Sequence, residues 1–167
     1  YSAGHWSTEP NSRKSLSKYL EMYEDIYNKT NLDRILGVIQ DVQPLNICDY
    51  GGGVGIVAIE LAKKGHNVTL IDASIDALRA AEYFAIKEGV NITTQCETSL
   101  DPNIYASCFD VIVSKDLIEH IDDDLSLIKT FHSSLRDKGV LILTTQNSKS
   151  LNYLLEGGIR KLLHPTV

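Results

Sequence analysis

The feature that most constrains the fold of this 167-residue chain is an alternation of short apolar segments with helical patterns. The apolar segments are continuous runs, which is typical of strands buried on both faces of a parallel sheet. Helices between such strands supply right-handed crossovers. We therefore predict an α/β fold built on a doubly wound, mostly parallel sheet. The expected strands are 45–50, 67–71, 91–95, 109–114 and 139–145, and the expected helices between them are 55–64, 75–88 and 122–136.

A helical region precedes the first expected strand. Apolar residues at helical spacing predict a helix over about 12–28 and a second over 32–39, with Asn31 as its N-cap. We expect residues 1–44 to form a helical extension that acts as a lid, and residues 45–167 to form the ligand-binding α/β domain.

Three tyrosines, Tyr19, Tyr23 and Tyr27, form a stripe in the first of these helices. Such a stripe is usually part of a core. The alternative is a cover over a ligand, because tyrosine suits an apolar site that needs one polar contact.

Composition excludes several classes of protein. The net charge of −6 argues against nucleic acid or an anionic membrane as the main partner. No apolar run approaches the roughly 20 residues of a membrane span. The three cysteines, Cys48, Cys96 and Cys108, show no CxxC spacing and are expected to be reduced thiols, so we predict a cytoplasmic protein.

A glycine loop gives the strongest functional signal. Asp49, Gly51, Gly53 and Gly55 follow a buried strand directly and lead into a helix. Glycines allow a tight turn and a close approach of backbone to ligand, and the amides at the helix start face the bound molecule. Asp72 ends the next strand, where a carboxylate can accept two hydrogen bonds from a ribose diol. The spacing predicts a cofactor that contains adenosine.

Two cofactors fit this pattern. Residues 53–58 also match the dinucleotide pattern G-x-G-x-x-G/A, so an NAD(P)-dependent oxidoreductase remains an alternative. Against it, about 44 residues precede the first strand and the chain has little room for a further substrate-binding region. Asp49 would also crowd a pyrophosphate, whereas it suits a cation. S-adenosylmethionine carries a sulfonium, an α-amino group and no phosphate, and is favoured.

With these residues in view, the chain resembles the class I S-adenosylmethionine-dependent methyltransferases. Within them it is most similar to the small-molecule group that includes the ubiquinone-biosynthesis O-methyltransferases. The segments that carry the resemblance are 49–55, 68–74, 109–121 and 135–147.

The resemblance implies roles for the glycine loop and two strand ends. Gly51, Gly53 and Gly55 would pack under the cofactor, and Asp72, followed by Ala73 in the same motif, would meet its ribose. Main-chain groups of Ser114 and Lys115 would hold the methionine part.

The chain departs from the family pattern at two places. The family often has an aspartate after the third strand that binds the adenine amino group. This chain has Glu97 and Thr98 there, which we expect to substitute. The family sheet also has two further C-terminal strands without a counterpart here, so we expect that a C-terminal portion is missing.

Chemistry at the site requires little beyond alignment, because methyl transfer from a sulfonium is a direct displacement. A base is needed only when the acceptor must lose a proton, and His120, just after the fourth strand, is the catalytic candidate. An equally good interpretation is that His120 caps or packs the next helix.

A divalent metal is a further possibility at the same segment. Asp116, Glu119 and His120 would share one face if this turn is helical, and some relatives bind a metal at this position. No fourth ligand is visible, so we predict no metal. The acidic residues 122–124 are expected to begin the following helix.

The sequence thus predicts methyl transfer from S-adenosylmethionine to an O, N or C atom of a small-molecule acceptor, with S-adenosylhomocysteine as product. The alternatives are the oxidoreductase and a non-catalytic methyltransferase-like binding module. Neither the acceptor nor the oligomeric state can be read from these patterns.

Overall fold

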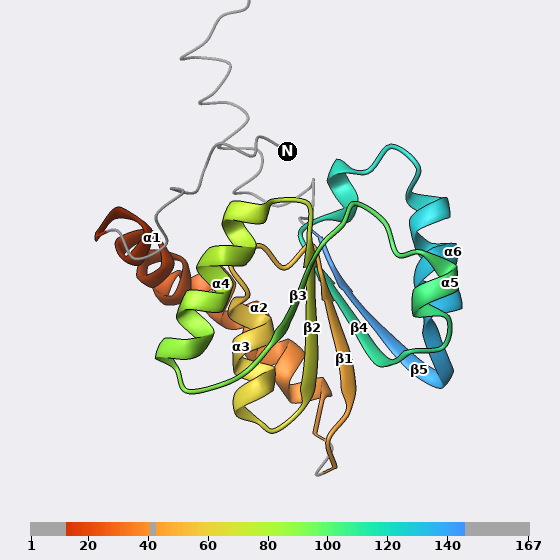
Figure 1. Ribbon diagram of the computed structural model, residues 1–167, viewed down its shortest axis with the longest axis horizontal. Coiled ribbons are helices and arrows are strands. Elements are labelled where there is room, and N and C mark those ends of the chain that lie inside the picture. The colour runs from red at the N-terminus through yellow and green to blue at the C-terminus, as the bar shows by residue number, and fades with distance from the viewer. Residues whose placement is uncertain (1–12, 41–42, 146–167) are drawn as a thin grey trace, which may run out of the picture.

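The computed structural model describes residues 13–40 and 43–145, and these form a parallel sheet with helices on both faces (Figure 1). The strand order is β3-β2-β1-β4-β5 and every neighbouring pair is parallel. This confirms the predicted doubly wound α/β fold. The strands are β1 (Asn46–Tyr50), β2 (Asn67–Asp72), β3 (Thr93–Cys96), β4 (Phe109–Lys115) and β5 (Leu135–Thr144).

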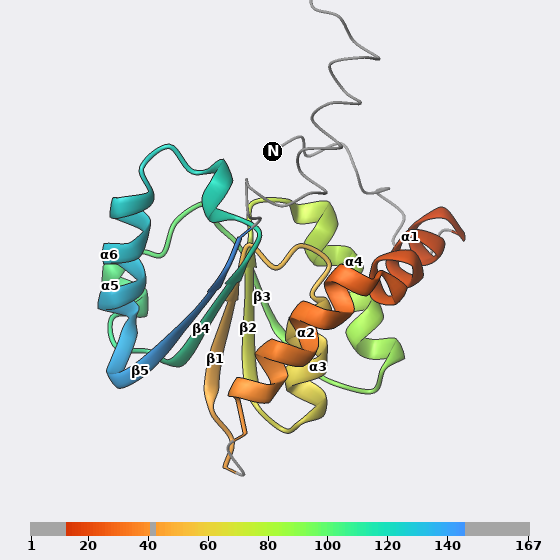
Figure 2. The same ribbon diagram turned by 180° about the vertical axis from the view of Figure 1, so that it is seen from behind.

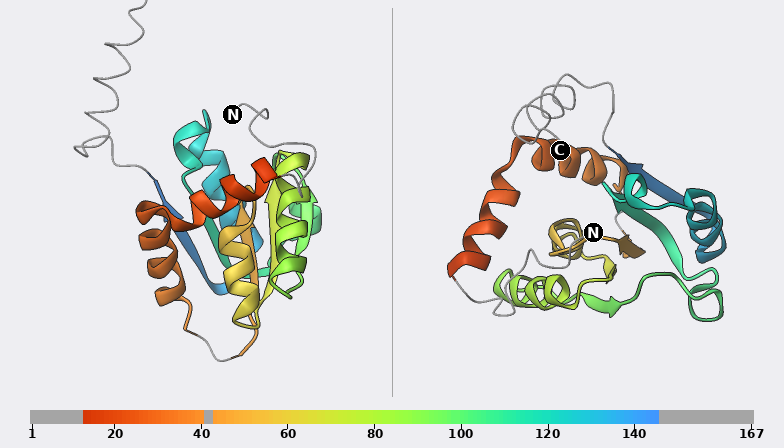
Figure 3. Two further views of the ribbon diagram at one scale, coloured as in Figure 1. Left: turned by 90° about the vertical axis from the view of Figure 1, so that its left-hand side faces the viewer. Right: turned by 90° about the horizontal axis from the view of Figure 1, so that it is seen from above.

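The helices divide between the two faces of the sheet. Figure 2 shows α2 in front of α3, on the face away from α5 and α6. Viewed from above in Figure 3, α1 and α2 form an arc around α3. None of the helices in the described ranges combines the length and apolar composition that a bilayer crossing needs. The helices are α1 (Arg13–Glu24), α2 (Ile26–Val38), α3 (Ile56–Lys63), α4 (Ile75–Lys87), α5 (Pro102–Tyr105) and α6 (Asp124–Ser134), with a 3₁₀ turn, η1 (Ile118–His120), before α6.

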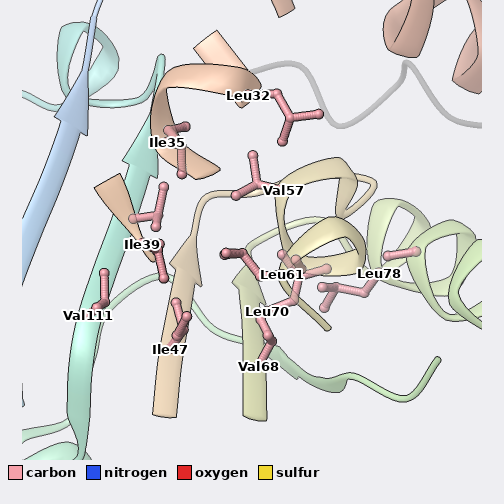
Figure 4. Packing of buried hydrophobic residues seen from close by; sticks show 13 residues of the cluster. Leu32, Ile35, Ile39, Ile47, Val57, Leu61, Val68, Leu70, Leu78 and Val111 are labelled. Carbon is pink, nitrogen blue, oxygen red and sulfur yellow. The ribbon is translucent and has the colours of Figure 1, made fainter. Parts of the chain in front are cut away.

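The larger core cluster lies between the sheet and the helices α2, α3 and α4 (Figure 4). Leu32 and Ile35 of α2 and Ile39, the C-cap of this helix, are buried in one cluster with residues of β1 and α3. Burial of apolar side chains is the main force that holds α2 to the sheet. The N-terminal extension is therefore packed on the α/β domain at α2.

The break between the first two helices differs from the prediction. Asp25 interrupts the helical run and caps α2, because its side chain accepts the backbone N–H of Asn28 at 3.0 Å. The predicted N-cap, Asn31, instead lies inside α2 and is buried. The boundary between α1 and α2 is set by side-chain capping at Asp25, which the spacing of apolar residues does not show.

Of the three tyrosines in the predicted stripe, the structure describes the side chain of one. Tyr19 is buried and stacks on Phe84 of α4 with ring centroids 3.8 Å apart. The side chains of Tyr23 and Tyr27 lie outside the described part. The Tyr19 side chain is therefore part of the core.

The fifth strand is longer than predicted. It begins at Leu135 instead of residue 139, and its pairing with β4 shifts between Phe109 and Val111. Lys138 within it has φ of 64°, a backbone conformation typical of turns. An irregular strand start of this kind leaves no clear apolar pattern. A predicted helical stretch at 150–163 lies outside the described residues.

Candidate functional site

The candidate site lies at the carboxyl ends of the strands, between β1 and β4. Chain connections run outward from β1 to β2 on one face of the sheet and from β4 to β5 on the other. Such a reversal opens a crevice above the strand ends, where ligands of open α/β sheets bind. The loops after β1, β2 and β4 all reach this edge.

The glycine loop after β1 has the conformation that its sequence predicts. Gly51, Gly53 and Gly55 have φ of 73°, 57° and 74°, which only glycine adopts readily. At Gly52 the constraint is space, because an added Cβ would overlap the side chains of Asp49 and Leu70. The loop therefore needs glycine for two different reasons.

Asp72 at the end of β2 holds this loop in place. Its carboxylate accepts the backbone N–H of Gly53 at 2.9 Å and that of Ser74 at 2.8 Å. An ionised carboxylate has about four lone-pair positions, so two amide contacts leave acceptor capacity for a ligand hydroxyl. The predicted ribose acceptor is thus also a structural support of the loop.

Asp49 is fully buried beneath the glycine loop. One carboxylate oxygen accepts the backbone N–H of Ala58 at 3.1 Å, and the other has no hydrogen-bond partner among the described residues. The pKa of Asp49 is raised to about 7, chiefly by burial; the hydrogen bond from the Ala58 amide lowers it, the Asp72 carboxylate raises it and Lys115 lowers it, all by less than burial does. A buried carboxyl with an unsatisfied oxygen beside a cavity is suited to a cationic ligand group.

Two cavities meet at Gly51. The first has a volume of about 280 Å³ and lies between the glycine loop, α2 and the end of β4. The second, of about 170 Å³, lies between the ends of β1 and β2 and the segment after β4. The lining of the first cavity includes Asp49, Gly53, Asn28, Lys115 and Asp116, and that of the second includes Asp72, Ala73, Glu97, Thr98, Leu117 and His120.

Two tyrosines support the wall formed by Glu97 and Thr98. The Tyr105 hydroxyl donates to the Glu97 carboxylate at 3.1 Å, and the Tyr50 hydroxyl donates to the Thr98 carbonyl at 2.8 Å. Burial and the adjacent Glu97 carboxylate raise the pKa of Tyr105 to about 12, so it remains a donor at neutral pH. The segment that departs from the family pattern is therefore held against the second cavity.

Ser114 and Lys115 end β4 at the same edge. Ser114 is fully buried, whereas Lys115 lines the first cavity. The Lys115 Nζ donates to Asp116 at 2.6 Å and to Asn28 of α2 at 2.9 Å. No sequence signal singled out Asn28, because its partner lies 87 residues away.

His120 and the acids near it lie at the carboxyl end of β4 and along η1. His120 is exposed at the end of η1 and lines the second cavity. Asp116 pairs with Lys115, while Glu119 accepts a hydrogen bond from the Thr145 hydroxyl at 2.9 Å. The described part of the chain contains no group of three or more His, Cys, Asp or Glu side chains arranged for a metal. Downstream, Asp123 caps α6 by accepting the Ser126 N–H, in agreement with the predicted acidic helix start.

Comparison with known proteins gives consistent matches. A family model described as a methyltransferase domain matches residues 21–164. A ubiquinone biosynthesis O-methyltransferase of Colwellia psychrerythraea is 33% identical over 112 residues, which cover 66% of this chain and 46% of that protein. The corresponding enzyme of Actinobacillus pleuropneumoniae is 31% identical over 136 residues, which cover 78% and 58%. The chain spans about half the length of the curated relatives it matches.

Solved structures give the same fold. The YcgJ protein of Bacillus subtilis superposes with a TM-score of 0.68 at 20% identity, over 82% of this chain and 60% of that one. At this identity the likeness concerns the fold alone.

Proposed function

The chain belongs to the methyltransferase domain family, and from this premise we propose that it transfers a methyl group from S-adenosylmethionine to a small-molecule acceptor. The product of the cofactor would be S-adenosylhomocysteine. The observation that carries the proposal is the pair of cavities that meet at Gly51, one beside the buried Asp49 and one beside Asp72.

The two cavities suit the two halves of the cofactor. Asp72, Ala73, Glu97 and Thr98 border the second cavity, where ribose and adenine would find carboxylate and main-chain partners. The methionine part would occupy the first cavity, against main-chain groups of Ser114 and Lys115. Gly51, Gly53 and Gly55 would lie beneath the junction, where absent side chains allow close approach.

Asp49 supports a cationic cofactor over a dinucleotide. When bound, S-adenosylmethionine supplies an electrophilic methyl group on a sulfonium. An unsatisfied carboxylate oxygen next to this position gains a favourable partner in a positive charge, whereas it would repel a pyrophosphate. This is the main argument against the NAD(P)-dependent alternative.

The chain's own residues then align the reactants and exclude water. His120 borders the second cavity from η1 and is our candidate base for removing the acceptor proton. The curated relatives are named as O-methyltransferases, which supports a hydroxyl acceptor for this chain.

We also propose the division of labour expected from the sequence. Residues 1–44 would cover the site as a lid, and residues 45–167 would hold the cofactor. The packing of α2 on the sheet beside the first cavity supports this arrangement. Cys48, Cys96 and Cys108 are free thiols, which supports a cytoplasmic location.

Calorimetric titration with S-adenosylmethionine, S-adenosylhomocysteine and NAD tests the proposal. We expect micromolar binding of the first two ligands and none of NAD. Incubation with S-adenosylmethionine labelled in its methyl group, together with a panel of phenols and catechols, should then label an acceptor. Binding of NAD alone would overturn the proposal. Cofactor binding without transfer to any acceptor would favour the non-catalytic binding module.

A further inference from the structure

Lys115 occupies a special position between the sheet and the N-terminal helices. It is the last residue of β4, its side chain is 18% exposed, and it lines the first cavity together with Asp49. Its ammonium donates to Asn28 at 2.9 Å, across 87 residues of sequence. The hydrogen bond therefore joins the cofactor edge of the sheet to α2.

Asn28 is itself fixed in the first turn of α2. Its backbone N–H donates to the capping carboxylate of Asp25, and its side-chain oxygen accepts from Lys115. One residue thus links the helix cap to the cavity wall. A shift of the Lys115 ammonium would therefore change its hydrogen bond to Asn28 at the start of α2.

The charges on the wall of the first cavity match an α-amino acid. Asp49 presents a carboxylate oxygen that has no partner among the described residues, which suits an ammonium group. Lys115, which is paired with Asp116 at 2.6 Å, presents a cation to the same cavity, which suits a carboxylate. A lysine ammonium is a point charge on a flexible stem, so it can be shared between Asn28, Asp116 and a ligand.

We propose that the Lys115 side chain binds the carboxylate of the amino-acid end of S-adenosylmethionine and, through Asn28, holds α2 over that end. The inference rests on the proposed function and adds to it a side-chain contact and a positioning role. Lys115 acts as the electrostatic partner, and Asn28 acts through Lys115.

The test compares two ligands that differ in the amino-acid end. S-adenosylhomocysteine carries the α-amino acid, whereas 5′-methylthioadenosine lacks it. For Lys115→Met we expect affinity for S-adenosylhomocysteine to fall about tenfold, in the range of a lost charge-assisted hydrogen bond, and affinity for 5′-methylthioadenosine to stay unchanged. Lys115→Arg should restore most of the affinity, and Lys129→Met, an exposed lysine on α6, is the matched control.

A separate measurement tests the coupling of ligand binding to α2. Hydrogen exchange of the α2 amides should slow when S-adenosylhomocysteine binds the unmodified protein, but not when 5′-methylthioadenosine binds. Asn28→Leu should remove this slowing and weaken S-adenosylhomocysteine less than Lys115→Met does.

The outcomes distinguish a failure of the proposed function from a failure of the role proposed for Lys115. If neither ligand binds the unmodified protein, the proposed function falls and the inference falls with it. If both ligands bind and Lys115→Met weakens them equally, or weakens neither, the role of Lys115 is overturned while the proposed function stands. If Asn28→Leu leaves the slowing of exchange intact, the coupling to α2 is overturned.

Discussion

The carboxylate of Asp72 accepts the backbone N–H of Gly53 at 2.9 Å, so the acid that ends β2 holds the glycine loop that follows β1. The two residues are 19 positions apart and belong to the two motifs that predicted an adenosine-containing cofactor. The proposed ribose contact and the stability of the loop therefore depend on the same side chain.

Asp72→Ala should damage stability and binding together. The Gly53 and Ser74 amides lose a charged acceptor, and we expect the free energy of unfolding to fall by about 2–4 kcal/mol. Affinity for S-adenosylhomocysteine should fall at least tenfold. Urea unfolding and calorimetry measure the two effects, with Asp137→Ala, an exposed acid in β5, as the control. Unchanged stability would contradict the structural role of Asp72.

Two alanine substitutions in the glycine loop should lower stability for different reasons. In Gly52→Ala the new methyl overlaps Asp49 and Leu70, and stability should fall by about 1–3 kcal/mol. In Gly53→Ala the methyl meets no described atom within 4 Å, so the positive φ of 57° alone should lower stability by about 1–2 kcal/mol.

The two variants also differ in where the new methyl group lies. Gly53 borders the first cavity, so Gly53→Ala should fold yet bind S-adenosylhomocysteine weakly. Thermal melting with and without ligand measures both. If Gly53→Ala binds as well as the unmodified protein, the cofactor does not lie against Gly53.

Asp49 should make cofactor binding depend on pH. Burial raises its pKa to about 7, so near neutral pH a large fraction of the protein carries the protonated acid. A cationic ligand favours the ionised form, so binding lowers this pKa and releases a proton. Affinity should therefore rise with pH up to about 7, by at most about tenfold per pH unit, and level off above it.

Calorimetry in buffers of different ionisation enthalpy measures the released proton. For the unmodified protein at pH 6.5 we expect a release of up to about three quarters of a proton per S-adenosylmethionine bound, which is the fraction of Asp49 that is protonated at that pH when its pKa is about 7. Asp49→Asn should abolish the release and leave affinity independent of pH in this range. Release of the same size from Asp49→Asn would assign the proton to another group.

His120→Ala should reduce turnover without affecting cofactor binding. Loss of a general base lowers kcat by about 10²–10⁴-fold when the acceptor must be deprotonated. His120 lines the second cavity but is exposed, so affinity for S-adenosylhomocysteine should change less than threefold, which is about 0.6 kcal/mol. His132→Ala, an exposed histidine on α6, is the matched control. An unaltered kcat would show that His120 is not the base.

The sheet and the glycine loop could be predicted because both depend on local sequence. Continuous apolar runs such as residues 111–113 are buried whichever strands they pair with, and the positive φ at Gly51 and Gly53 follows from residue type. Asp72 could be predicted as well, since its place at a strand end depends only on where β2 stops.

The tertiary structure decided the features that rest on pairs distant in sequence. The unsatisfied oxygen of Asp49 and its raised pKa arise from burial beneath the glycine loop, and the link from Lys115 to Asn28 exists because α2 packs on the sheet. A hydrogen bond across 87 residues leaves no periodic trace along the chain. The residue pattern thus determined the fold and predicted the kind of ligand, whereas packing determined which charges line the cavity in which we propose that the ligand binds.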